Sequence, residues 1–200
     1  MQTSTPSHPG NVYDLLEIRT QSKRSIERGA VTEAYPLDLT LARQLLNVAL
    51  AGEILCVLRY RHHQIVAKGI DYPQVSAEFA EHADAEQRHM MALAERIDQL
   101  GGDPDFNPAT IAGRAATEYD ASSTLEEMIA ADLVAERVVI EIYRRMAQWF
   151  GTGDPTTRRL LESILADEEE HANDLAALLA TFTGTNRGNH EPPLPRRRFS

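Results

Sequence analysis

The sequence predicts an all-α protein built around a four-helix bundle. Apolar residues recur at helical spacing in four stretches of roughly 25 to 30 residues, and no stretch shows the alternation typical of strands. Tight turns join the first stretch to the second and the third to the fourth. About twenty residues separate the second from the third, which is longer than a usual helix connection. We therefore expect this segment to travel the length of the bundle, so that its flanking helices are parallel.

Helix start and stop signals delimit the first two helices. Residues 13–31 form a charged amphipathic stretch that predicts an accessory helix. Asp38, in the sequence Pro-Leu-Asp, is a candidate N-cap for a long helix that continues to about Lys68. The next helix begins after the Tyr72-Pro73 turn and ends at Gly101-Gly102.

The second half of the chain repeats this organisation. Asp103–Ser123 contains Asp-Pro and Asn-Pro steps and lacks a long periodic pattern, as expected of the crossover. Ser123-Thr124, followed by two glutamates, predicts a capped helix that reaches Phe150. Pro155 suits the first position of a last helix that extends to about Phe182.

These signals divide the chain into three parts. Residues 1–36 form an N-terminal extension with the short amphipathic helix, and residues 37–183 form the bundle. Residues 184–200 form a tail rich in proline and arginine, which we expect to be disordered and solvated. The chain has 200 residues, so a second folded domain is not expected.

Composition narrows the class of protein. With 42% hydrophobic and 25% charged residues, and with no apolar run approaching the ~20 residues of a membrane span, we expect a soluble protein without a membrane partner. The first residues lack the basic and apolar regions of a secretion signal, which predicts a cytoplasmic location. The single cysteine, Cys56, excludes an internal disulfide and any CxxC motif. The net charge of −10 indicates that nucleic acid is not a partner.

Polar residues of one kind interrupt the apolar faces of all four helices. Glu168 and His171 stand three residues apart, so both project from one face, and apolar residues surround them at helical spacing. Glu86 and His89 repeat this pair in the second long helix. Single glutamates, Glu53 and Glu136, occupy the corresponding faces of the other two helices. The sequence thus places four carboxylates and two imidazoles in the core.

Charge balance predicts what these six residues bind. Burying four carboxylates together is costly, and two divalent cations would cancel their charge. The apolar faces carry too few lysines or arginines to pair with the carboxylates instead. Glu86 follows Glu53 by 33 residues and Glu168 follows Glu136 by 32, which places all the ligands at one level. We expect a pair of sites suited to Fe or Mn, with Zn as a competitor.

The same residues resemble the di-iron site of the ferritin-like superfamily, and that of the bacterioferritins in particular. The matching pattern is Glu53, Glu86-x-x-His89, Glu136 and Glu168-x-x-His171. The sequences Asp132-Leu-Val-Ala-Glu136 and Ile164–His171 also resemble helices of that family, and Tyr60 matches the tyrosine beside its centre. The resemblance implies a ferritin-like four-helix bundle over residues 38–182.

The resemblance also implies an activity. A bacterioferritin-like protein would bind two Fe ions per subunit, oxidise Fe²⁺ to Fe³⁺ with O₂ or H₂O₂, and store iron in a homo-oligomeric cage. Glu86 and Glu168 would each hold one iron together with His89 and His171, and Tyr60 would donate an electron or a hydrogen bond. Which of the two single glutamates is bridging and which is terminal stays open, as do the subunit number, 24 or 12, and the oxidant.

One residue differs from the bacterioferritin pattern. Their haem ligand is a methionine directly after the second-helix glutamate, where this chain has Gln87. Met91, four residues further on, is more typical of a subunit interface than of a shifted haem ligand. We therefore do not expect haem.

Two other functions fit the same pattern. The centre could belong to a ferritin-like di-iron or di-manganese oxidase or hydroxylase that acts on another substrate, which would need an apolar channel. Alternatively, the chain could be a DNA-protecting miniferritin or a structural metal-stabilised bundle. A miniferritin, however, places its metal between subunits, with ligands from other helices.

The sequence also supports predictions about residues near the ligands. Asp132 and Asp167 flank ligands and are candidates for orienting imidazoles. His82 is expected to be a histidine at the edge of the core, and Cys56 a small core residue. His62 and His63 follow arginines near a helix end and are expected to be solvated.

Overall fold

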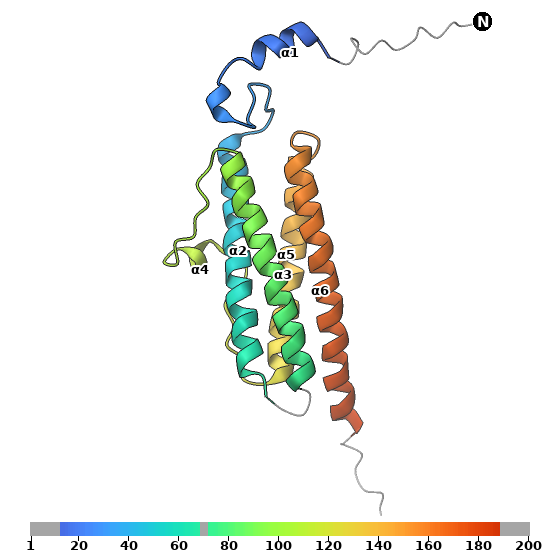
Figure 1. Cartoon of the computed structure of the whole chain (residues 1–200). Helices are drawn as coiled ribbons and strands as arrows, with labels where there is room; N and C mark the ends of the chain where they lie inside the picture. The colour runs from blue at the N-terminus through green and yellow to red at the C-terminus, as the bar shows by residue number, and fades with distance from the viewer. Residues whose placement is uncertain (1–12, 69–71, 189–200) are drawn as a thin grey trace, which may run out of the picture.

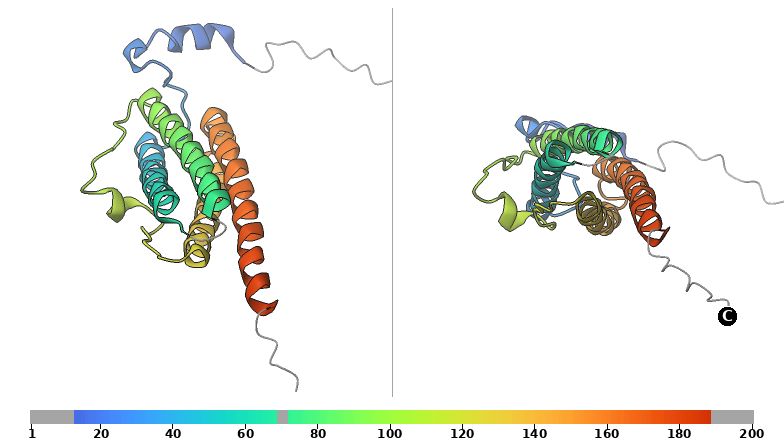
Figure 2. Two further views of the ribbon diagram at one scale, coloured as in Figure 1. Left: turned by 60° about the horizontal axis from the view of Figure 1, so that its bottom comes forward. Right: turned by 90° about the horizontal axis from the view of Figure 1, so that it is seen from below.

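The computed structural model describes residues 13–68 and 72–188, and it confirms an all-α four-helix bundle. Its long helices are α2 (Leu39–Val66), α3 (Tyr72–Gln99), α5 (Leu125–Phe150) and α6 (Pro155–Gly188). Figure 1 shows α3 antiparallel to α2, α6 antiparallel to α5, and α3 parallel to α5. Seen from below in Figure 2, the four helices surround a common core.

The helix ends follow from local hydrogen bonds. The Asp38 carboxylate accepts hydrogen bonds from the backbone N–H groups of Thr40 and Leu41, at 2.8 and 3.1 Å, and so caps α2 as predicted. Thr124 caps α5 through the N–H of Glu127. At the end of α3, Gly101 has a φ of +69°, and the N–H of Gly102 returns to the carbonyl of Ile97. This left-handed turn closes the helix.

The segments outside the bundle differ in detail from the prediction. Instead of one accessory helix, the extension contains the short helix α1 (Leu15–Gln21) and a 3-10 helix, η2 (Ile26–Arg28). Ser25, at a φ of +47°, takes a left-handed conformation that no helix continues through. The crossover contains a further short helix, α4 (Ile111–Arg114), while α6 extends to Gly188 rather than ending near residue 182.

Two apolar clusters fill the bundle, one toward each end. The upper cluster lies at the end where α2 begins and includes Leu46, Leu50, Ile97, Phe150 and Leu161. The lower cluster lies at the opposite end and includes Tyr60, Phe79, Met128, Ile129 and Leu175. Burial of these side chains is the main driving force for packing the four helices. Between the two clusters, the core is polar.

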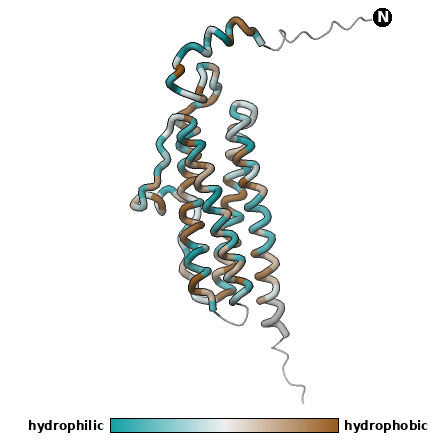
Figure 3. The backbone as a smooth tube through the Cα atoms, in the orientation of Figure 1, coloured by the Kyte–Doolittle hydropathy of each residue, from teal (hydrophilic) through white to brown (hydrophobic). Residues whose placement is uncertain are grey.

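The extension joins the upper end of the bundle through specific contacts. Tyr35 donates a hydrogen bond to Asp154 at 2.9 Å, and Arg96 donates to the same carboxylate. A Cβ at Gly153 would lie 2.8 Å from the Leu37 side chain, so a larger residue at this position would force Leu37 to shift. In α1 and η2, by contrast, apolar side chains such as Leu16 and Ile26 are exposed. Figure 3 shows hydrophobic stretches (brown) of the tube in this part of the chain, above the bundle.

Among the described residues, one helix, α2, is long and apolar enough by length and composition to cross a membrane. The sequence prediction of no such stretch is therefore wrong in this respect. The core helix of a soluble protein meets the same criterion, and 56% of the most apolar window of α2 is buried in the bundle.

Candidate metal centre

The polar layer between the two clusters contains all six predicted ligands. They come from four helices and are 7% exposed or less: Glu53 on α2, Glu86 and His89 on α3, Glu136 on α5, and Glu168 and His171 on α6. Their ligand atoms form two groups, within each of which the atoms lie within 4.8 Å of one another. One group contains Glu53 and His89, the other contains Glu136 and His171, and Glu86 and Glu168 belong to both.

The two histidines face the shared carboxylates through the same ring atom. His89 Nδ1 lies 3.1 Å from Glu168 Oε1 and 3.6 Å from both Glu53 and Glu86. His171 Nδ1 lies 3.4 Å from Glu86 Oε1 and 3.3 Å from Glu168 Oε2. Helical spacing of three residues aligns each histidine with the glutamate before it.

Each of the six side chains has a buried atom without a hydrogen-bond partner among the described residues. These atoms are Glu53 Oε2, Glu86 Oε1, His89 Nδ1, Glu136 Oε2, Glu168 Oε1 and Oε2, and His171 Nδ1. A buried polar atom left without a partner costs about 1–3 kcal/mol. Carboxylate oxygens and imidazole nitrogens are also the ligands of first-row divalent metals. The residues therefore fit two such ions.

The pKa values show how the metal-free centre balances its charge. Burial, and then the neighbouring Glu86, raises the pKa of Glu53 to about 8. Burial, Glu168 and Glu86 raise the pKa of Glu136 well above its ordinary value. Although burial opposes it, the adjacent carboxylates of Glu168 and Glu86 raise the pKa of His171 to about 9. Without metal the centre thus retains protons, which bound cations would displace.

Two tyrosines hold the single glutamates from the opposite half of the bundle. Tyr60 donates a hydrogen bond to Glu136, and Tyr143 donates one to Glu53. Both tyrosines are fully buried, and burial is the largest cause that raises their pKa values. The sequence pattern identified Tyr60 as a candidate but not Tyr143. The signal was present, because each tyrosine follows a single glutamate by seven residues.

The neighbours of the two ligand histidines differ. Asp167 lies 3.0 Å from His89 Nε2 and is placed to orient that ring. His171 instead stacks on His82, with ring centroids 4.1 Å apart, and His82 Nδ1 lies 3.3 Å from the Tyr60 hydroxyl. Burial, followed by the proximity of His171, lowers the pKa of His82 to about 3, so His82 is neutral.

A buried ionic cluster below the ligands was not predicted. Arg59 donates to Asp132 at 2.6 Å, and His63 Nδ1 lies 2.8 Å from the other oxygen of Asp132. All three residues are 1% exposed or less, so the expectation of a solvated His63 is wrong. Asp132 therefore contacts His63 and Arg59 rather than a ligand imidazole. Arg59 also donates to the backbone carbonyl of Glu118 and so links this cluster to the crossover.

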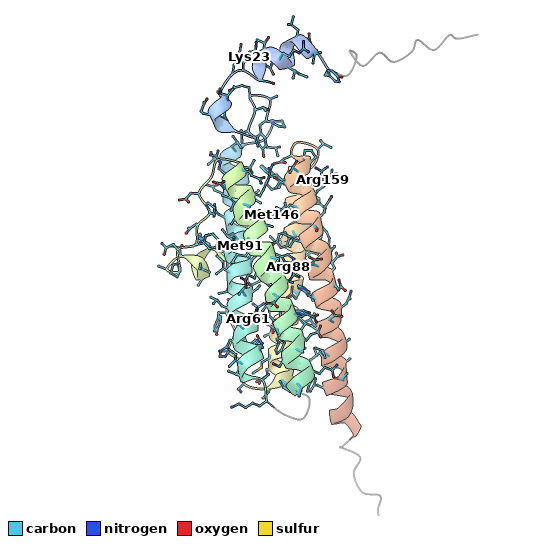
Figure 4. The ribbon with its side chains drawn as sticks, viewed as in Figure 1. Lys23, Arg61, Arg88, Met91, Met146 and Arg159 are labelled. Atoms are coloured by element: carbon cyan, nitrogen blue, oxygen red, sulfur yellow. The ribbon has the colours of Figure 1, made fainter. Side chains whose placement is uncertain are left out.

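Other residues singled out from the sequence lie outside the centre. Cys56 is buried in the lower cluster, and burial raises the pKa of its thiol. Met91, labelled in Figure 4, lies on α3 and is 47% exposed. The C-terminal arginines fall outside the described residues.

Comparisons with known proteins bear on the whole bundle. Residues 43–184 match the family described as "Ferritin: Ferritin-like domain". Bacterioferritin of Mycobacterium leprae is 28% identical over 68% of this chain and 82% of its own length. A dodecameric thioferritin, the bacterioferritin-related protein of Bacteroides fragilis, superimposes with a TM-score of 0.74 and 30% identity. That match covers 78% of this chain and 94% of the thioferritin.

A further relative corrects the expected partners. The nutrient stress-induced DNA-binding protein of Synechococcus sp. is 34% identical over 68% of this chain and 78% of its own length. The exclusion of nucleic acid is therefore wrong. It rested on net charge, which averages over the chain and ignores the basic side chains gathered in the extension: Arg19, Lys23, Arg24 and Arg28.

Proposed function

The chain belongs to the ferritin-like family, and on that premise we propose that it is a cytoplasmic ferroxidase of the bacterioferritin type. Its substrate is Fe²⁺, two ions of which bind within one subunit and are oxidised to Fe³⁺ by O₂ or H₂O₂. The product is stored or detoxified in a homo-oligomeric cage. The observation that carries the proposal is the set of six buried ligands, each with an atom that lacks a partner among the described residues.

The geometry supports a role for each residue. Glu86 and Glu168 belong to both ligand groups and are assigned as bridging ligands. Glu53 with His89, and Glu136 with His171, then complete one position each as terminal ligands. Tyr60 and Tyr143 hold the terminal carboxylates through hydrogen bonds, which fixes the oxygen that each presents to the metal.

The oxidase or hydroxylase alternative is less well supported. An organic substrate would need an apolar cavity that reaches the centre. Of the cavities found among the described residues, the one that reaches His171 is lined mainly by charged side chains of α3 and α6. The more apolar cavity over α5 is lined by crossover residues and by Val134 and Val138, and none of its lining residues is a ligand.

The decisive experiment removes the two bridging carboxylates. Glu86→Ala with Glu168→Ala should reduce the initial rate of Fe²⁺ oxidation by more than about 100-fold, because both metal positions lose a ligand. The rate is followed by the growth of ferric absorbance. The control, Glu95→Ala with Glu126→Ala, removes the same charge at exposed positions and should retain the wild-type rate. Unchanged oxidation in the Glu86/Glu168 variant would overturn the proposal, and a monomeric particle in light scattering would overturn storage.

A second candidate function is association with DNA through the extension. Four basic side chains lie between residues 19 and 28, and Figure 4 shows Lys23 beyond the upper end of the bundle. Basic residues that contact phosphates release counterions, which makes binding dependent on salt. The relatives named as DNA-binding proteins give this candidate its support.

Fluorescence anisotropy with duplex DNA of mixed sequence tests this candidate. Replacing the four basic residues of the extension by glutamine should weaken binding and flatten its dependence on salt. The matched control replaces four arginines of the bundle: Arg144, Arg145, Arg158 and Arg159. Equal losses in both variants, or no loss in the first, would refute a role for the extension.

A further inference from the structure

Helix α1 of the extension presents an apolar face that its own chain leaves uncovered. Leu15, Ile18 and Arg19 lie on one face of α1 by helical spacing, and Leu16 lies beside them. The three apolar side chains are 45 to 76% exposed, and α1 contains no buried residue. Exposed apolar side chains that gather on one face typically mark a site of contact with another molecule.

The residues that follow α1 anchor the extension at the upper end of the bundle. Val31 is 3% exposed and belongs to the upper cluster, and Tyr35 donates its hydrogen bond to Asp154. Figure 1 shows α1 beyond this end, clear of the sides of its own bundle. Its apolar face is therefore free to contact another molecule.

A groove between the crossover and α5 has an apolar wall of its own. The groove has a volume of about 530 Å³. Val134 and Val138, one helical turn apart, line it and are 63% and 37% exposed. The other α5 residues that line it are small: Ala130, Ala131 and Ala135. These short side chains leave room for larger apolar side chains from outside.

Polar groups of the crossover complete the groove without partners of their own. Thr117 is 6% exposed, and its Oγ1 has no hydrogen-bond partner among the described residues. Buried hydroxyl groups normally have a partner, so this atom indicates that the groove receives one. The exposed carboxylate of Glu118 forms no ion pair within residues 13–68 and 72–188, and Asp120 adds a second carboxylate to the lining.

The charges of α1 and of the groove are opposite. Arg19, Lys23 and Arg24 are exposed, and in the described part of the chain none of them forms an ion pair. Glu17, the acidic residue of α1, is held at 3.0 Å by Gln21 on the same helix. The groove therefore offers an apolar wall and carboxylates, and α1 offers an apolar face and free cations. Such complementarity selects a partner and its orientation.

We propose that α1 of one subunit docks in this groove of a second copy of the chain. Leu15, Leu16 and Ile18 cover the exposed valines, and the basic side chains meet the carboxylates of the crossover. The contact is heterologous, because one copy supplies α1 and the other the groove, so it can continue from subunit to subunit around a closed assembly. It uses none of the six ligands of the proposed ferroxidase centre and goes beyond that function.

Cross-linking between two different chains tests the contact. Leu16→Cys and Val134→Cys are placed on separate chains, which carry different affinity tags and are co-expressed. The native Cys56 is buried in both chains. Mild oxidation of the metal-free protein, cleared of nucleic acid, should join the two chains by a disulfide, because only cysteines brought close together can form one. The cross-linked product is measured on a non-reducing gel.

A matched pair controls for chance collisions. Leu16→Cys with Glu162→Cys places the second cysteine at an exposed position on α6 and should give at least about 10-fold less product. Equal cross-linking in both pairs, or none in the Leu16/Val134 pair, would overturn the proposal. A single chain with both Leu16→Cys and Val134→Cys that forms the disulfide only within itself would also overturn it, because the occupant would then be the chain's own helix.

Charge substitution tests the electrostatic part of the contact. Arg19→Glu with Arg24→Glu should lower the yield of the Leu16/Val134 cross-link by at least about 5-fold. The control, Arg145→Glu with Arg159→Glu, makes the same change of charge at exposed positions of the bundle, and an equal loss in it would refute charge complementarity. The cross-link requires no metal. A chain that forms it but does not oxidise Fe²⁺ would therefore refute the ferroxidase and leave the docking of α1 intact.

Discussion

The two halves of the bundle carry the same ligands in different surroundings. In α2 with α3, and again in α5 with α6, a single glutamate is followed by a Glu-x-x-His pair. Four residues before the glutamate of each pair, however, one half has His82 and the other has Ile164. One residue before it, the halves have Ala85 and Asp167. The comparison teaches that a symmetric ligand set can still provide two inequivalent metal positions, since each histidine has a different neighbour.

The second difference lies further from the ligands. Arg59 and His63 follow Glu53 by six and ten residues, and the corresponding positions after Glu136 are Ile142 and Met146. Asp132 likewise corresponds to Ala49. One end of the core therefore contains a buried ionic cluster where the other end contains apolar side chains.

The largest expected effect comes from breaking this cluster. Asp132→Ala leaves Arg59 buried without its partner and should lower the free energy of unfolding by about 3–5 kcal/mol, measured by urea denaturation. The control, Asp84→Ala, breaks the exposed Arg61–Asp84 pair and should cost less than about 1 kcal/mol.

A triple variant then makes the two ends alike. Arg59→Ile, Asp132→Ala and His63→Met install the residues of the opposite end and should recover most of the lost stability. A single Asp132→Ala variant that is as stable as the Asp84→Ala control would show that the cluster is not the source of the asymmetry.

The stability of the metal-free chain should fall as pH rises. The pKa of Glu53 is raised from 4.5 to about 8, so the folded state binds the proton more tightly and stability declines across this window. The pKa of His171 is raised from 6.5 to about 9, and its contribution, complete below 6.5, is lost as pH rises through 9. Each group contributes a slope of at most about 1.4 kcal/mol per pH unit.

Urea midpoints of the metal-free chain across this range measure the effect. Glu53→Gln should flatten the low-pH part of the plot of urea midpoint against pH. Glu136→Gln tests whether the α5–α6 half of the bundle contributes in the same way. A urea midpoint that rises with pH would contradict the predicted fall in stability.

The smallest expected effect concerns the two metal positions. Asp167→Ala removes the partner of His89 Nε2 and should weaken the position that contains His89 by about 10–100-fold, while the position that contains His171 changes little. Titration with Co²⁺, followed by its visible absorption, should separate into two phases. The control, Asp98→Ala, removes an exposed carboxylate elsewhere on α3 and leaves α6 unchanged. This variant should titrate as the wild type. Equal weakening of both positions would contradict their inequivalence.

The sequence predicts features that depend on neighbouring residues, and it misses features that depend on packing between distant helices. Helical spacing placed the six ligands on inward faces, and the caps at Asp38 and Thr124 depend on the next three residues alone. The partners of Arg59 and His63 lie 73 and 69 residues away, so they required the packing of α5 against α2. The position of His63 near a helix end predicts a solvated side chain. In the structure, however, Asp120 of the crossover covers it, with Oδ1 3.6 Å from His63 Nε2.

The division of the ligands between two helical hairpins has a consequence for folding. α2 with α3 supplies Glu53, Glu86 and His89, and α5 with α6 supplies the other three, so neither hairpin holds a complete metal position. Each hairpin can form early from contacts close in sequence, whereas their docking closes a long loop and brings four carboxylates together. Under the proposed function, metal ions would bind the docked state more tightly than the separate hairpins and so shift the equilibrium toward docking by mass action. The supply of iron would thus affect the last step of folding, because the bound ions would hold the two preformed hairpins together.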